Sequence, residues 1–257
     1  MKKLLLSLFM LVSIETFGCR CGSTPLLEKY QRSEFIATAK ILKVLQDNKN
    51  EDYHDIEIEV INVYKGTQIN RIKIISSLNS SCAFLPLENT SWLIFASKDQ
   101  KGFLSFGFCS GSMQIDRQFD LVAYPNLDIK YKKSLDLKLD ALNFLKRSNI
   151  STINKFNLII TNGTRTCIDD LKDFKEKNRF AVYELNVNQD LSIGNIRTLK
   201  GFNNKVLSQK LTKCIRENID IDTKYLNKIP EKTKVILIYF YYLAEGKDPS
   251  FISEWDL

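Results

Sequence analysis

A Cys-x-Cys motif, Cys19-Arg20-Cys21, directly follows the apolar N-terminal segment of the chain. Two lysines precede Leu4–Ile14, an apolar run of 11 residues, and the small residue Gly18 stands just before the motif. This pattern predicts a secretory signal at residues 1–18, because the run is shorter than the about 20 residues that span a bilayer. Removal of the signal makes Cys19 the first residue, and its α-amine and carbonyl oxygen then form a five-membered chelate for a metal. The alternative is a lipoprotein signal, in which an acyl anchor on Cys19 removes that chelate.

All six cysteines lie in the predicted mature chain. An even number of cysteines behind a signal peptide predicts disulfides in an oxidising compartment, so we expect a secreted or periplasmic protein. Cys19 and Cys21 have two candidate partners downstream, Cys82 and Cys109. The remaining two, Cys167 and Cys214, form a third bridge or stay as buried free cysteines on apolar helix faces.

The charge of the chain argues against nucleic-acid binding. Without residues 1–18 it has 35 Lys and Arg against 29 Asp and Glu, and the excess is spread without a basic tract. We interpret these charges as a solvated surface. No second apolar run compares with the first, so we expect no transmembrane helix in the mature chain.

Apolar periodicity predicts five strands and two helices in the first half. Thr24-Pro25 is typical of a helix start, with Thr24 as N-cap, and the apolar face of Leu135–Leu145 indicates an amphipathic helix. The strands are expected at Phe35–Leu45, around Ile56–Val60, at Ile72–Ile74, at Ser91–Ala96 and at Phe103–Cys109.

Ser148–Asn154 is polar and without pattern, so we place a domain boundary there. Beyond it the pattern predicts a second, small α+β domain at residues 155–257, an antiparallel sheet with packed helices. Its strands are expected at Phe156–Ile160, Phe180–Val187, Ile193–Leu199 and Val235–Leu243, and its helices at Cys167–Lys175 and Val206–Asn218. The expected fold class is therefore mainly β with α.

Residues 19–148 resemble the tissue inhibitors of metalloproteinases and the wider netrin-like modules. The resemblance rests on Cys19-Arg20-Cys21, on Tyr64-Lys65-Gly66 after a strand, on Cys82 before Trp92-Leu93-Ile94-Phe95, and on Cys109-Ser110-Gly111-Ser112. It implies a five-stranded OB-fold barrel with flanking helices. It also implies the bridges Cys19–Cys82 and Cys21–Cys109, which leave Cys167 and Cys214 as the third pair.

The same resemblance implies a site. Cys19 would bind the zinc of a metallopeptidase through its amine and carbonyl, and Arg20, Cys21 and Gly22 would contact that partner. Arginine at position 20 suits an acidic or open specificity pocket.

The second half resembles the TonB C-terminal fold. The likeness is carried by the pattern from Tyr183 through Gly201 into the helix that contains Leu207. It implies a module for protein contacts.

Little in the chain indicates catalysis. The one histidine, His54, is expected at the surface, and motifs for a nucleophilic serine, a zinc protease or a phosphate loop are missing from the sequence. We therefore expect a non-enzymatic binding protein without a cofactor or metal of its own, most simply a metalloendopeptidase inhibitor. The alternatives are an envelope protein-interaction module without inhibitory activity, and a thiol-disulfide redox protein.

Overall fold

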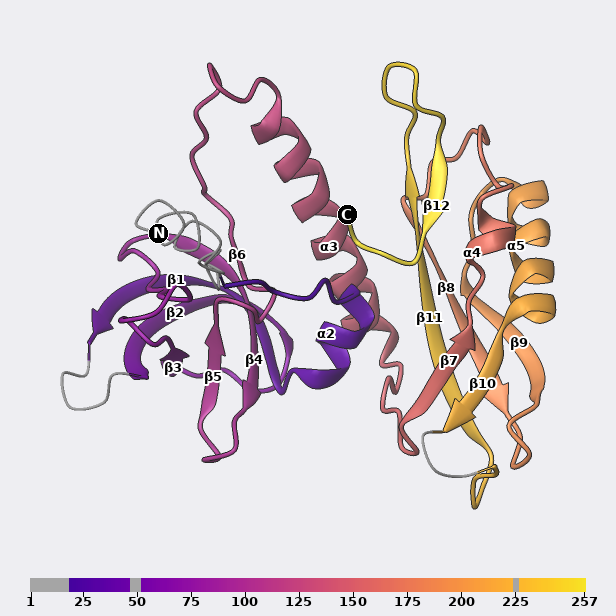
Figure 1. Ribbon diagram of the computed structural model, residues 1–257, viewed down its shortest axis with the longest axis horizontal. Coiled ribbons are helices and arrows are strands. Elements are labelled where there is room, and N and C mark those ends of the chain that lie inside the picture. Colours follow the sequence, from indigo (N-terminus) through magenta and orange to yellow (C-terminus); the bar gives the residue numbers. More distant parts are fainter. Residues whose placement is uncertain (1–18, 47–51, 224–226) are drawn as a thin grey trace, which may run out of the picture.

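The computed structural model describes residues 19–46, 52–223 and 227–257 (Figure 1). The predicted signal at residues 1–18 and most of the polar loop expected at residues 47–52 lie outside these ranges. A β-barrel lies at one end, and helices α2 (Leu26–Arg32) and α3 (Leu127–Ser148) lie beside it. A four-stranded sheet covered by helix α5 (Lys205–Asn218) forms the other end.

The first half forms a closed barrel of five strands, as the fold-class prediction expected. Its order is β1-β2-β3-β5-β4, and β1 also pairs with β4, which closes the ring. Pairing is antiparallel except between β3 and β5, which are parallel. A two-residue strand, β6 (Met113–Gln114), is added to β4. The barrel strands are β1 (Phe35–Leu45), β2 (Tyr53–Lys65), β3 (Arg71–Ile75), β4 (Ser91–Lys98) and β5 (Leu104–Gly107).

Bulges allow β1 to pair with two neighbours. The register of β1 against β2 shifts at three places, and such irregularities bend a strand and increase its twist. Alternate residues of β1 (Phe35, Ala37, Ala39 and Ile41) share one face and lie in the barrel core, each at most 2% exposed. Ile36 on the outer face is buried as well, because helices cover it.

Two barrel predictions need correction. His54 is fully buried, and its Nε2 lies 3.2 Å from the carbonyl oxygen of Ser76, so the expected surface position is wrong. His54, Ile56 and Ile58 occupy every second position of β2 and are all buried, so their side chains share the inner face of the strand. Strand β5 covers only Leu104–Gly107 of the predicted Phe103–Cys109, and Phe108 beyond its end is half exposed.

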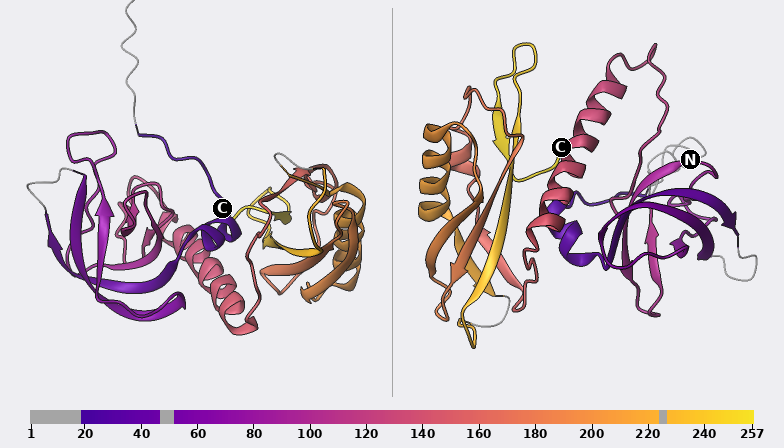
Figure 2. Two further views of the ribbon diagram at one scale, coloured as in Figure 1. Left: turned by 90° about the horizontal axis from the view of Figure 1, so that it is seen from below. Right: turned by 180° about the vertical axis from the view of Figure 1, so that it is seen from behind.

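Two helices cover the barrel on the side that faces the second half. α2 (Leu26–Arg32) begins one residue later than predicted, with Pro25 in the N-cap position. α3 (Leu127–Ser148) is longer than the predicted Leu135–Leu145. Its buried residues include both Leu135 and Leu137, on different faces, because the helix packs between the barrel and the four-stranded sheet (Figure 2).

The second half contains an antiparallel sheet in the order β12-β11-β8-β9 and a separate pair, β10-β7. The hairpin β8–β9 and helix α5 lie where the pattern predicted them. Strands β10 and β12 were not predicted, and β7 begins two residues after the expected start. The elements are β7 (Leu158–Asn162), β8 (Phe180–Val187), β9 (Ile193–Lys200), α5 (Lys205–Asn218), β10 (Asp220–Thr223), β11 (Thr233–Tyr242) and β12 (Phe251–Ser253).

The helix predicted at Cys167–Lys175 is wrong in extent. α4 covers only Arg165–Ile168, and the chain then turns, with Asp173 in the left-handed region at φ 61°. The backbone N–H of Asp173 donates to the carbonyl oxygen of Ser250. This long-range bond replaces the bond that a continued helix would provide.

The strands β8 and β11 are buried on both faces, since side chains alternate across a sheet. One face, with Tyr183 and Tyr239, packs against α5. The other face, with Phe180 and Phe240, packs against α3, α2 and the outside of the barrel. The two halves therefore share one apolar cluster, and the division at Ser148–Asn154 stays a prediction.

Candidate functional site

Residues 19–25 form no helix or strand and cross the surface of the barrel to reach α2 (Figure 1). Two disulfides attach them: Cys19–Cys82, with a Cα–Cα distance of 5.0 Å, and Cys21–Cys109, at 5.2 Å. Arg20 and Gly22 are exposed. The structure thus brings together the predicted site residues and holds them at the surface.

A hydrogen-bonded loop holds Cys82. Ser76, which is 2% exposed, accepts from the backbone N–H of Phe84 at 2.7 Å. The hydroxyl of Ser80 donates to the carbonyl oxygen of Ser77 and accepts from the backbone N–H of Cys82 at 3.1 Å. The anchor point for Cys19 is therefore an ordered turn of the barrel.

The second anchor is the Cys109-Ser110-Gly111-Ser112 motif after β5. The hydroxyl of Ser112 accepts from the backbone N–H of Phe95 in β4 at 2.8 Å, and Ser110 donates to Ser112 at 2.8 Å. Gly111 has a φ of +82°, and a Cβ atom there would lie 2.8 Å from Cδ of Lys29. The stem of Lys29 consequently passes directly over this glycine.

The Tyr64-Lys65-Gly66 motif holds the end of α2 against the barrel. Nζ of Lys65 donates to the carbonyl oxygens of Tyr30 at 2.7 Å and Gln31 at 3.2 Å, at the end of the helix where cations are favourable. Burial lowers the pKa of Lys65, whereas nearby Glu34 raises it. Gly66 has a φ of +87°, and a Cβ atom there would lie 2.6 Å from the carbonyl oxygen of Glu34, so the turn requires glycine.

Residues 254–257, at the end of the second half, contact helices α2 and α3 of the first half. The carboxylate of Asp256 is 3% exposed and lies 3.0 Å from Nζ of Lys29 in α2 and 3.5 Å from Nζ of Lys138 in α3. Lys138 also donates to the backbone carbonyl of Asp256 at 2.8 Å and to Ser134 at 2.6 Å. Burial lowers the pKa of Lys138, although the charge of Asp256 acts in the opposite direction.

A cavity of about 410 Å³ lies between the N-terminal segment, the Cys109 loop, α2 and the residues around Asp256. Its wall includes the half-exposed Phe108 and Trp255, which is 40% exposed. Both halves of the chain therefore contribute to the surface next to Cys21.

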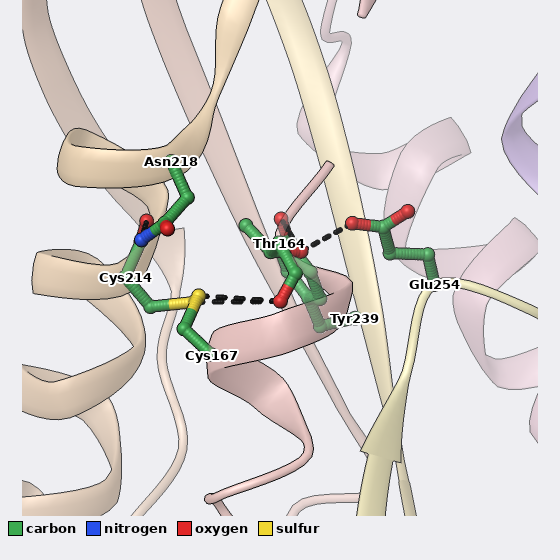
Figure 3. The surroundings of a disulfide bond; sticks show 6 residues. All are labelled: Thr164, Cys167, Cys214, Asn218, Tyr239 and Glu254. Carbon is green, nitrogen blue, oxygen red and sulfur yellow. Dashed lines mark hydrogen bonds between the residues drawn. A yellow bond between two sulfur atoms is a disulfide. The ribbon is translucent and has the colours of Figure 1, made fainter. Parts of the chain in front are cut away.

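The third bridge, Cys167–Cys214, lies in the second half and joins α4 to α5 (Figure 3). Its sulfur atoms face the carbonyl oxygen of Thr164, at 3.2 Å and 3.8 Å, and these are contacts without a hydrogen because the sulfurs are bonded to each other. Thr164 donates to Glu254 and lies 3.2 Å from the hydroxyl of Tyr239, whose pKa is raised by burial. This bridge is remote from Cys19 and sits in the packed layer between α5 and the sheet.

Sequence reasoning missed Lys29 and Asp256. They are 227 positions apart, and no local pattern connects them. The one hint in the sequence was the short helix predicted after the Cys-x-Cys motif, because that helix contains Lys29.

Three disulfides are typical of a protein outside the reducing cytosol. In the described ranges, no helix is both long and apolar enough to cross a membrane. The described residues also contain no group of three or more His, Cys, Asp or Glu side chains that could hold a metal ion.

In comparisons with known proteins, the chain matches no protein-family model, and no curated protein matches its sequence.

Proposed function

We propose that residues 19–148 form a netrin-like OB-fold domain that inhibits a zinc-dependent endopeptidase through the amine and carbonyl of Cys19. The observation that carries this proposal is the double attachment of the N-terminal segment. Cys19 and Cys21 are each bridged to a separate ordered loop of the barrel, so the residue between them is held in place at the surface.

The strand arrangement supports the OB-fold assignment. An OB-fold is a five-stranded Greek-key barrel, and this barrel closes in the order β1-β2-β3-β5-β4. The helix α3 follows the barrel in sequence and packs on β2. The proposed netrin-like assignment rests, in addition, on the two bridges that attach the N-terminal segment to the barrel.

The chemistry requires a free amine on Cys19, hence cleavage before this residue and no acylation. An α-amine has a pKa of about 7.7–8.0, so a substantial fraction is neutral near that pH and can donate its lone pair. A catalytic zinc keeps one coordination position open for water or substrate, and the amine would occupy it. Because the bridge to Cys82 fixes this residue, little conformational entropy would be lost on binding.

The bridges also define what else would contact the partner. Arg20 is exposed beside Cys19, and Ser81 and Ala83 flank its bridge partner Cys82 on the exposed surface. Phe108, next to Cys109, is 50% exposed and adds apolar area. An arginine at the position nearest the zinc favours a peptidase with an acidic or open specificity pocket, since burying an unpaired guanidinium is costly.

The test compares the correctly cleaved protein with a form that carries one additional alanine before Cys19. Intact mass confirms the cleavage site, the absence of an acyl group and three disulfides in each. Inhibition is measured on a panel of zinc endopeptidases, and the added residue is expected to abolish it, because the amine moves away from a Zn–N distance of about 2.0–2.1 Å. Carbamylation of the amine should have the same effect. Equal inhibition by both forms would refute the proposal.

A second candidate function is protein binding at the edge of the second sheet, where the TonB-like resemblance was drawn. Strand β9 is an eight-residue edge strand, and all of its residues are exposed or half-buried. Exposed edges can accept an additional strand from a partner. Such binding should be insensitive to the residue before Cys19, and the extension variant therefore separates the two candidates.

A further inference from the structure

The segment between β6 and α3 projects away from both the barrel and the four-stranded sheet, together with the first turns of α3 (Figure 1). Its end is the segment of residues 121–129, which we call the apolar tip. Residues 121–125 are five consecutive exposed apolar residues, Ile129 is exposed one turn later, and the exposed polar residues Asn126 and Asp128 lie between them. Val122 is 94% exposed, Tyr124 62%, Ile129 50% and Leu121 49%. Single exposed apolar residues are ordinary, but a contiguous exposed group marks a surface that binds something.

The tip is an ordered structure. The carboxylate of Asp120 accepts from the backbone N–H groups of Val122 at 3.0 Å and Ala123 at 3.1 Å, and its carbonyl oxygen accepts from Tyr124 at 2.9 Å. These bonds satisfy the backbone of the turn within the turn itself. The apolar side chains are thereby left facing outward.

The base of the tip is fastened to the barrel. The hydroxyl of Tyr131 donates to the carbonyl oxygen of Gln114 in β6 at 2.5 Å, and the rings of Tyr131 and Phe119 are in edge contact at 5.1 Å. The guanidinium of Arg117 lies 5.2 Å from the ring centre of Phe119. The fold thus supports a protrusion whose outermost side chains make no contribution to the core.

Basic residues follow directly behind the apolar ones. Lys130, Lys132 and Lys133 occupy the first two turns of α3 and are exposed. Lys130 and Lys133 share Glu245, from the connection between β11 and β12, at 3.3 and 3.6 Å. All these groups are about half or more exposed, so the ion pairs are weak in water and their lysines can turn toward another anion.

We propose that the apolar tip inserts into the interfacial layer of an anionic lipid membrane, with the lysines behind it at the level of the headgroups. The tip projects from the molecule and forms no part of the cavity described above, so it is shaped to enter a soft apolar layer. Aliphatic side chains with one tyrosine, backed by lysines whose stems can lie along the interface, match the layering of such a surface. This inference is independent of the proposed inhibition.

The test measures co-sedimentation of the full disulfide-bonded protein with vesicles of phosphatidylcholine, with and without phosphatidylglycerol. Binding is expected with the anionic vesicles and should weaken as salt is added. The double variant Val122→Asp, Tyr124→Asp should bind about tenfold or more weakly, since it places two charges in the apolar layer. Lys132→Glu should reduce binding to anionic vesicles only.

Leu87→Asp is the matched control, because Leu87 is 71% exposed but belongs to the connection between β3 and β4 and not to the tip. It should bind vesicles like the unchanged protein. Unfolding midpoints check that each variant remains folded. Three results would overturn the proposal: no binding to either vesicle, equal binding by the double variant, or a self-associated protein that the double variant makes monomeric. The last result would assign the tip to a second copy of the chain.

Discussion

Asp256 and Lys29 form a buried ion pair of 3.0 Å between the end of the described chain and the helix that follows the Cys-x-Cys motif. The same carboxylate also lies 3.5 Å from Nζ of Lys138 in α3. One carboxylate of the second half therefore lies between two lysines of the first half and is attracted to both. Because α2 begins five residues after Cys21, this contact also stabilises the base of the candidate site.

Replacing Asp256 by asparagine should lower the free energy of unfolding by about 3 kcal/mol. Removal of one partner from a buried ion pair leaves the other charge uncompensated, and Lys138 here is 7% exposed. Urea unfolding at neutral pH measures the change. The control is Glu231→Gln, which breaks the exposed pair with Lys155 and should cost less than about 1 kcal/mol. Equal effects of the two substitutions would contradict the structural role of Asp256.

Glu176 should make the second half sensitive to acid. Burial alone would raise its pKa, but backbone N–H groups, led by Asn204 and Asn178, hold the pKa below its usual value. The stabilising contribution of the carboxylate is therefore complete above the unfolded pKa of about 4.3 and is lost as the pH falls through the lower folded value.

Glu176→Gln should accordingly lower stability at pH 7 by about 1–3 kcal/mol, the cost of leaving such donors poorly satisfied. It should also flatten the fall in stability below about pH 4.5. Denaturant unfolding between acidic and neutral pH shows both effects. The exposed Glu217, paired with Lys213 at 3.8 Å, provides the control Glu217→Gln. If the stability of Glu176→Gln falls with acid as steeply as that of the unchanged protein, this carboxylate is not the cause of the acid sensitivity.

Most of the regular structure could be predicted because it follows from short-range patterns. The alternation in β2 and β8 and the spacing of Leu207, Leu211 and Ile215 in α5 are visible within about ten residues. His54 belongs to the same alternation as Ile56, but its place at the start of a strand that looked exposed led to the prediction of a surface position. Position in the pattern was the better guide, since a buried imidazole can bond to a nearby backbone carbonyl, here that of Ser76 just after β3.

The errors occur where distant residues decide the structure. The helix expected from Cys167 ends at Ile168, and the N–H of Asp173 instead bonds to Ser250, 77 positions away. The strand β12 has only three residues and depends on its pairing with β11. In the candidate site, the cysteine pairs followed from the netrin-like resemblance, whereas the ion pair of Asp256 could only be found from the fold.

The three disulfides should open in a defined order under mild reduction of the folded protein. Cys21 and Cys109 are both exposed, whereas Cys214 is 5% exposed on the buried face of α5. Thiol attack requires access to a sulfur atom, so Cys21–Cys109 should be reduced first and Cys167–Cys214 last. Alkylation at timed intervals followed by peptide mass analysis gives the order. Early labelling of Cys167 or Cys214 would contradict the packing described here.

Cleavage between the two halves should yield fragments that remain associated. Lys155 is exposed in the segment between α3 and β7, and all three bridges lie within one half or the other. The halves share a cluster in which Leu142 of α3 packs with Phe180 and Phe240 of the second sheet, and separation would expose these residues to water. Limited trypsin digestion should therefore give two bands in non-reducing SDS gels but a single peak in size exclusion. Addition of Asp256→Asn should favour dissociation into two peaks. Two peaks from the unchanged protein would mean that each half is stable alone and that the shared cluster contributes little.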